Sequence, residues 1–213
     1  MRNIIFDLDG TILDSEKLYF EILRKVAKAF NVILTNEQYN DFYSMVLADK
    51  AKKLVDKYYA NGSVDDIIKK YRSIELNETE KYGKRLLFPD TVETLSQLKD
   101  RGYRLYLCTN SRTAHVLDLL RISGIDDYFE GMVCREMCDK FKPDPQPYQK
   151  VIDIYHLNKE ETCAVEDTSH GVQSAKMAGL FTFGIKRDYP IDDKYTDICI
   201  CQLNELVEII DGI

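Results

Sequence analysis

The sequence is notable first for what it lacks. It has no long uninterrupted apolar run, which argues against a transmembrane helix. It has no excess of basic residues, since its net charge is -7, and nothing indicates a basic face for nucleic acid. The first apolar run, residues 3–6, is too short for the core of a signal peptide and is followed by Asp7. We therefore expect a cytoplasmic protein that binds neither nucleic acid nor a membrane.

A cysteine and histidine pattern with the spacing of a zinc site is also missing. The pair Cys134 and Cys138 is not followed at such a spacing by a second close Cys or His pair, so a zinc site is disfavoured. The other cysteines are scattered, which is typical of reduced thiols in a cytosolic protein. The three histidines lie too far apart in the sequence to indicate a cluster. Internal repeats and low-complexity segments are absent as well.

The composition is that of a soluble globular protein. The 213 residues, 45% hydrophobic and 31% charged, allow one domain with an insertion or two small domains. Residues 15–85 show only helical patterns: an apolar stripe after Ser15, a capping-box sequence over 35–38, a third helix near 51–58 and a fourth from Ser63. We expect an inserted all-helical subdomain over 15–85.

The remaining residues, 1–14 and 86–213, alternate between strand and helix. Strands are expected over 3–6, 103–108, 132–134, 162–165, 181–185 and 197–201. Helices are expected over 92–98, 114–123, 147–157 and 171–178. This alternation predicts an α/β fold, with right-handed crossovers in a doubly wound parallel sheet.

The segment Asp7-Leu8-Asp9-Gly10-Thr11 is the most informative in the chain. Its two carboxylates lie where the first strand ends, at the sheet edge where ligands bind in open α/β folds. Burying two like charges side by side is costly unless they share a cation or a proton. The segment therefore indicates a metal site with a nucleophile.

Three later loops are expected at the same edge. Thr109-Asn110-Ser111 offers a hydroxyl and an amide where a helix begins, which suits an anion, although these residues are also ordinary helix caps. Lys142-Pro143-Asp144-Pro145 is stiffened by its prolines and holds Lys142 in place. Glu166-Asp167 offers the oxygen ligands that Mg²⁺ prefers, or else forms an acidic helix N-terminus capped by Ser169.

These four loops, in this order, resemble the haloacid dehalogenase superfamily of phosphoryl-transfer enzymes. The resemblance rests on the segment 7–11, Thr109-Asn110, Lys142-Pro143 and Glu166-Asp167. It implies a Rossmann-like sheet and identifies residues 15–85 as the helical cap of that superfamily. The subgroup most similar to this chain contains β-phosphoglucomutase and phosphoglycolate phosphatase, which share the Glu-Asp form of the last motif.

The resemblance also implies a role for each site residue. Asp7 is expected to attack phosphorus and carry an aspartyl-phosphate, and Asp9 to act as acid and base. The expected cofactor is Mg²⁺, held by Asp7, the Asp9 carbonyl, Glu166 and Asp167. The phosphoryl group is expected to contact Asp7, Gly10, Thr109, Asn110 and Lys142. Thr109 and Lys142 count among the catalytic residues because they stabilise its charge.

We therefore expect a Mg²⁺-dependent phosphatase that hydrolyses a phosphate monoester of a small metabolite. Asp9 favours phosphate esters, because family members that cleave carbon–halogen or phosphonate bonds lack an acid there. The oligomer is expected to be a monomer or weak dimer. The substrate would be chosen by cap residues such as Tyr19, Tyr43 and Lys50.

Two alternatives remain open. A sugar phosphomutase of the β-phosphoglucomutase type carries an arginine in its cap, whereas residues 43–50 here contain neither arginine nor glycine. Lys50 is the available substitute for that arginine, although its ammonium is a point charge rather than a bidentate guanidinium. A non-catalytic binding protein on the same fold ranks last, because such a protein is free to lose Asp9 or Lys142 and both are present.

Overall fold

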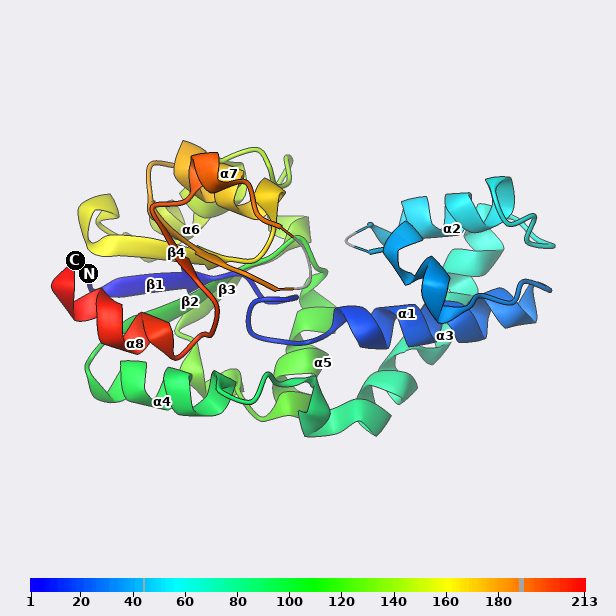
Figure 1. Ribbon diagram of the computed structural model, residues 1–213, viewed down its shortest axis with the longest axis horizontal. Helices are drawn as coiled ribbons and strands as arrows, with labels where there is room; N and C mark the ends of the chain where they lie inside the picture. The colour runs from blue at the N-terminus through cyan, green and yellow to red at the C-terminus, as the bar shows by residue number, and fades with distance from the viewer. Residues whose placement is uncertain (44, 188–189) are drawn as a thin grey trace. The chain divides into compact units, whose positions relative to one another are not determined.

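The computed structural model describes residues 1–43, 45–187 and 190–213. It divides into two compact units (Figure 1): Met1–Asp14 with Leu87–Ile213, called the sheet unit, and Ser15–Leu86, called the helical unit. The division predicted from the sequence places the second boundary one residue earlier, between 85 and 86. Ser44, part of the 43–50 stretch compared with the mutase branch, lies outside the described residues.

The sheet unit is built on six parallel strands in the order β3-β2-β1-β4-β5-β6. The strands are β1 Asn3–Phe6, β2 Arg104–Cys108, β3 Gly131–Val133, β4 Thr162–Glu166, β5 Phe181–Ile185 and β6 Ile198–Ile200. The central strand β1 pairs with β2 through Ile5 and Tyr106 and with β4 through Ile5 and Ala164. Its four residues are all buried, as expected for a parallel strand covered on both faces.

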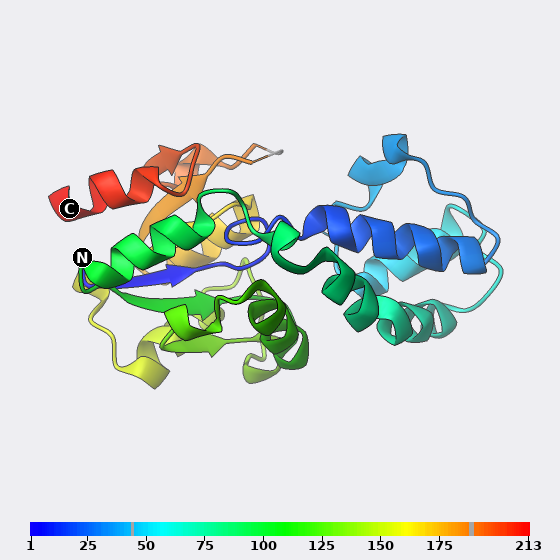
Figure 2. The same cartoon turned by 90° about the horizontal axis from the view of Figure 1, so that it is seen from below.

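Helices cover both faces of this sheet (Figures 1 and 2). They are α4 Thr91–Asp100, α5 Thr113–Ser123, α6 Gln146–Tyr155, α7 Ser169–Met177 and α8 Glu205–Ile209. Helices α6 and α7 lie on one face, and α4, α5 and α8 lie on the other. The predicted doubly wound α/β fold is confirmed. Helix α8 was not predicted, because its five residues are too short for a clear period.

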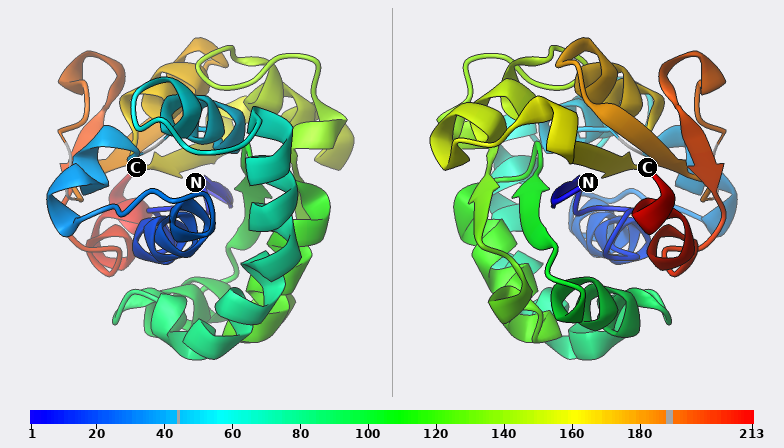
Figure 3. Two further views of the ribbon diagram at one scale, coloured as in Figure 1. Left: turned by 90° about the vertical axis from the view of Figure 1, so that its right-hand side faces the viewer. Right: turned by 90° about the vertical axis from the view of Figure 1, so that its left-hand side faces the viewer.

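The face under α6 and α7 carries a continuous apolar core. Ile5, Tyr106 and Ala164, one from each central strand, pack in it with Tyr148 and Val151 of α6. Both chain termini lie at one end of the sheet unit (Figure 1), on the side that faces the viewer in the right-hand view of Figure 3. The apolar packing under α6 and α7 fixes α6 against the strands whose carboxyl ends lead into the polar loops.

Among its described residues, the helical unit contains three α-helices: α1 Glu16–Ala29, α2 Leu47–Asp56 and α3 Val64–Tyr82. Ser63 begins α3 with a capping box, because its Oγ accepts from the Asp66 N–H at 3.1 Å and its N–H donates to Asp66 Oδ2 at 3.2 Å. The helix predicted after the 35–38 sequence is wrong. A short 3₁₀ helix, Asn36–Asp41, forms instead, because no apolar period follows to carry an α-helix.

No helix among the described residues has both the length and the apolar character needed to cross a membrane.

Candidate active site

Polar residues gather where β1, β2 and β4 end. Asp7 directly follows β1, Thr109 directly follows β2, and Glu166 is the last residue of β4. These strands are neighbours and run parallel, so their carboxyl ends share one edge of the sheet. Lys142 reaches the same edge from the loop before α6. The structure thus brings together residues from all four predicted loops.

Lys142 is the centre of this cluster. Its Nζ donates to Asp7 Oδ1 at 2.6 Å, to Glu166 Oε1 at 2.5 Å and to the Cys108 carbonyl at 2.7 Å. Its side chain is 5% exposed. Burial opposes the charged form, but Asp7 and Glu166 outweigh it and hold the pKa of Lys142 above its ordinary value. Lys142 therefore stays an ammonium at neutral pH.

Three buried carboxylates surround that ammonium. Asp7, Glu166 and Asp167 each offer an oxygen, and the three oxygens lie within 4.8 Å of one another. Burial raises the pKa of Asp7 to about 8, although Lys142 lowers it. Burial, followed by the charges of Asp7 and Glu166, raises the pKa of Asp167 well above its ordinary range. Without a further cation, the three carboxyl groups therefore cannot all ionise at neutral pH, because Lys142 supplies only one balancing charge.

The donor set fits a divalent cation with oxygen ligands. Glu166 Oε2 is buried and accepts no hydrogen bond from any described residue. An orphaned buried carboxylate oxygen is costly, and a cation or its bound water supplies the missing partner. Asp7, Glu166 and Asp167 are thus the residues available to hold a metal ion here.

Two glycines make room for these carboxylates. Gly10 has φ +86°, and a Cβ there would lie 2.1 Å from Asp167 Oδ2. A Cβ on Gly171 would lie 1.9 Å from Glu166 Oε2. Side chains at these positions would therefore displace the acidic cluster. Gly10, predicted to contact phosphate, lies against Asp167 in this structure.

Asp9 is held by the loop after β2. The Ser111 hydroxyl donates to Asp9 Oδ2 at 2.7 Å, and the Ser111 N–H donates to Thr109 Oγ1 at 3.0 Å. Asn110 Oδ1 accepts from the Lys142 N–H at 3.3 Å. These bonds join the predicted acid/base residue, the predicted phosphate loop and the lysine loop into one network.

Side chains that were not predicted as site residues also contact this network, although Thr11 and Ser111 lie in the predicted loops. Ser111 bonds Asp9, Thr11 Oγ1 donates to Asp167 Oδ1 at 3.2 Å, and Tyr148 bonds Glu166. Arg187 donates to the carbonyls of Gly10 and Thr11, each at 3.1 Å.

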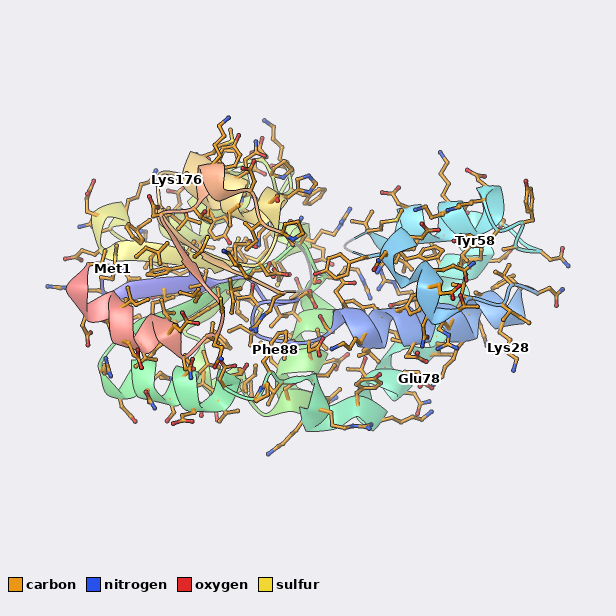
Figure 4. All side chains as sticks on the ribbon, in the orientation of Figure 1. Met1, Lys28, Tyr58, Glu78, Phe88 and Lys176 are labelled. Carbon is orange, nitrogen blue, oxygen red and sulfur yellow. The ribbon has the colours of Figure 1, made fainter. Side chains whose placement is uncertain are left out.

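Arg187 also stacks on Phe88, which Figure 4 labels, with its guanidinium carbon 3.6 Å from the ring centroid. The pattern in the sequence that could have indicated Arg187 is its position just after β5, at the same edge of the sheet.

Comparisons with known proteins agree with this site. A family model described as haloacid dehalogenase-like hydrolase matches residues 4–185. The phosphorylated carbohydrates phosphatase of Thermotoga maritima is 28% identical over 182 residues, covering 84% of this chain and 82% of that protein. The phosphoglycolate phosphatase of Aquifex aeolicus is 27% identical, with 100% of this chain and 98% of that protein covered.

A solved structure adds evidence on the fold. The crystal structure of β-phosphoglucomutase from Clostridium difficile aligns with a TM-score of 0.81 and 18% identity, covering 100% of this chain and 96% of that one. At this identity the likeness shows the fold alone. The family match shows more than the fold, because residues 4–185 contain all four loops that carried the predicted resemblance. That prediction is confirmed: the chain belongs to the haloacid dehalogenase-like hydrolase family.

Proposed function

We propose that this protein is a Mg²⁺-dependent phosphatase that hydrolyses a small phosphorylated metabolite through an aspartyl-phosphate at Asp7. The observation that carries the proposal is the single ammonium of Lys142 bonded to Asp7 and Glu166 inside a buried acidic cluster. Phosphoryl transfer needs mainly positioning and charge stabilisation, which this arrangement provides. The two phosphatase relatives, which act on phosphorylated carbohydrates and phosphoglycolate by their names, support the same reaction class.

The metal ion would be held by the carboxylates of Asp7, Glu166 and Asp167 and by the Asp9 carbonyl. The first three supply oxygens within 4.8 Å of one another, and three carboxylates exceed the one ammonium of Lys142. When bound, Mg²⁺ supplies a Lewis acid that offsets the repulsion between Asp7 and an anionic phosphate.

In the first step, the Asp7 carboxylate attacks phosphorus and the bond to the leaving oxygen breaks. Asp9 gives its proton to that oxygen, so an alcohol departs and Asp7 carries the phosphoryl group. Lys142, bonded to Asp7 Oδ1, stabilises the developing charge. The Thr109 hydroxyl and the Asn110 backbone N–H hold the phosphoryl oxygens.

In the second step, Asp9 takes a proton from a water molecule that attacks the same phosphorus. The bond to Asp7 breaks, inorganic phosphate forms, and both aspartates return to their starting states. The Ser111 hydroxyl, 2.7 Å from Asp9 Oδ2, fixes the orientation of this carboxyl group in both steps.

The helical unit acts as the cap that selects the substrate. Lys50 is buried on α2, with its Nζ 3.8 Å from Glu16 Oε2 and 5.6 Å from the centroid of the Tyr19 ring. A buried cation placed beside one acid and one aromatic ring suits a second anionic group on the substrate.

The same lysine supports a second candidate, a sugar phosphomutase of the β-phosphoglucomutase type. Such an enzyme returns the phosphoryl group to a sugar hydroxyl instead of water, and it must hold a second phosphate meanwhile. Lys50 offers a point charge for that phosphate rather than the bidentate fork of an arginine. Hydrolysis remains the first candidate because no arginine occurs in residues 43–50.

A phosphate-release screen tests the proposal. Sugar phosphates, phosphoglycolate and nucleotides are incubated with the enzyme in Mg²⁺ or in chelator. We expect release only with Mg²⁺, and a loss on the order of 10⁴-fold or more in Asp7→Asn, since a nucleophile has no substitute. Asp153→Asn, at an exposed position on α6, serves as the matched control.

Two outcomes would redirect the interpretation. Activity that persists in Asp7→Asn or in chelator overturns the mechanism. An isomerised sugar phosphate without free phosphate moves the function to the mutase.

A further inference from the structure

Tyr148 lies beside the acidic cluster without a role in the proposed reaction. It is fully buried on α6, and its hydroxyl donates to Glu166 Oε1 at 2.7 Å. Lys142 donates to the same oxygen at 2.5 Å, and its Nζ lies 5.1 Å from the centroid of the Tyr148 ring. Two buried side chains from two segments thus converge on one oxygen of one carboxylate.

The two oxygens of Glu166 differ sharply as a result. Oε1 accepts two hydrogen bonds, whereas Oε2 is buried and has no hydrogen-bonding partner among residues 1–43, 45–187 and 190–213. Gly171 leaves space for this carboxylate, because a Cβ there would lie within 2.3 Å of both oxygens. The side chain is therefore held in one orientation, with one oxygen saturated and the other available.

We propose that Tyr148 is a positioning residue that, together with Lys142, fixes Glu166 so that Oε2 stays available to a divalent cation or its bound water. This proposal rests on the metal site of the proposed function. Partners of this kind orient metal ligands in proteins, and their loss typically weakens metal binding 10- to 100-fold.

The competing explanation is that Tyr148 only fills the core. Its ring belongs to the apolar cluster with Val151 and Ala164, so packing alone accounts for the ring. Packing does not account for the hydroxyl, because a phenylalanine fills nearly the same volume. The hydroxyl is the group that the Glu166 bond requires, and removing it separates the two explanations.

The test is Tyr148→Phe, with Mn²⁺ as the probe because it takes the same hard oxygen ligands as Mg²⁺. Free Mn²⁺ is measured by electron paramagnetic resonance during titration of the folded protein. We expect about 10-fold weaker Mn²⁺ binding, because Glu166 keeps one of its two donors and loses its fixed orientation.

Tyr106→Phe is the matched control. Tyr106 is also fully buried in the sheet unit, but its hydroxyl donates to Glu130 Oε2 at 3.2 Å rather than to the acidic cluster. We expect this variant to bind Mn²⁺ as the unmodified protein does. Equal affinity in Tyr148→Phe and the unmodified protein overturns the role of Tyr148 and leaves its ring as core packing.

Asp167→Asn separates the role of Tyr148 from the proposed metal site on which that role depends. If the unmodified protein binds no Mn²⁺, or if Asp167→Asn binds it equally well, the metal site fails and the role of Tyr148 fails with it. If Asp167→Asn loses binding while Tyr148→Phe keeps it, only the role of Tyr148 fails.

A second measurement uses the unmodified protein, so it decides the question even if Tyr148→Phe does not fold. Tyrosine labelled with ¹³C at Cζ is followed by nuclear magnetic resonance as Mg²⁺ is added. We expect the Tyr148 signal to shift when Glu166 shares its charge with the cation, while the Tyr106 signal stays in place. A stationary Tyr148 signal at saturating Mg²⁺ contradicts the proposal.

Discussion

The sheet unit and the helical unit bury charge in different ways. In the sheet unit, Lys142 bonds acids that lie 135 and 24 residues away, and its side chain is 5% exposed. In the helical unit, Glu78, labelled in Figure 4, bonds Lys25 of α1 and Lys81 of its own helix. Those lysines are 50% and 57% exposed. The charges around Lys142 meet at one buried point, whereas the partners of Glu78 are exposed on helix faces.

This difference separates charged groups that serve the reaction from charged groups that only stabilise the fold. Exposed pairs such as Lys81 with Glu78 contribute about 0.2–1 kcal/mol each and are screened by salt. The cluster around Lys142 keeps three carboxyl groups close together and out of water, which is costly for folding and useful for binding a cation. Substitutions in the cluster around Lys142 should therefore change the reaction, and those in the helical unit should change selectivity or local stability.

After Asp7→Asn, Asp9→Asn should have the largest effect. Asparagine keeps the shape of the side chain and can still accept from Ser111, but it transfers no proton. We expect kcat to fall by ~10²–10⁴-fold, the usual contribution of general acid–base catalysis. Steady-state phosphate release measures this loss, with Asp153→Asn as the matched control. If kcat stays within threefold of the unmodified enzyme, Asp9 is not the acid and base.

Much of the site in the sheet unit follows from the sequence for a geometric reason. Parallel strands end at one edge, so an apolar run followed by Asp7, Thr109 or Glu166 places that residue at the edge. Tyr148 escapes this reasoning because it lies on a helix, and for Arg187 the position after β5 indicates the edge but not the contact it makes. Arg187 reaches Gly10 across 177 positions of sequence, and no local pattern encodes such a contact.

Lys50→Met tests the selectivity assigned to the helical unit. Losing a charged hydrogen-bonding group costs ~1.5 kcal/mol or more, so we expect about a 10-fold fall in kcat/KM for phosphoglycolate, which carries a second anionic group. For p-nitrophenyl phosphate, which lacks one, kcat/KM should stay unchanged. Lys52→Met, exposed on the same helix, is the control. Equal losses on both substrates would falsify a selective role.

The helical unit follows from the sequence less completely. Helical periods locate α1 and α3, because burial of one face repeats every three or four residues. The capping signals are less reliable, since Ser15 precedes α1 without a side-chain capping bond, whereas Ser63 makes one. A helical hydrophobic period also indicates which face of a helix is polar, but it does not indicate what that face binds. It therefore predicts no substrate.

Ser63→Ala should have the smallest effect. It tests whether the helical unit can lose stability while the sheet unit stays unchanged. Removing the hydroxyl that accepts from the Asp66 N–H should cost about 1 kcal/mol of helix stability. Ser73→Ala is the control, because Ser73 bonds the Lys70 carbonyl inside the same helix and alanine is the better helix former. Hydrogen exchange should quicken at the start of α3 and stay unchanged in β1 and β4. Faster exchange in those strands would mean that the two units unfold together, so that the helical unit could not vary its binding surface without cost to the catalytic edge.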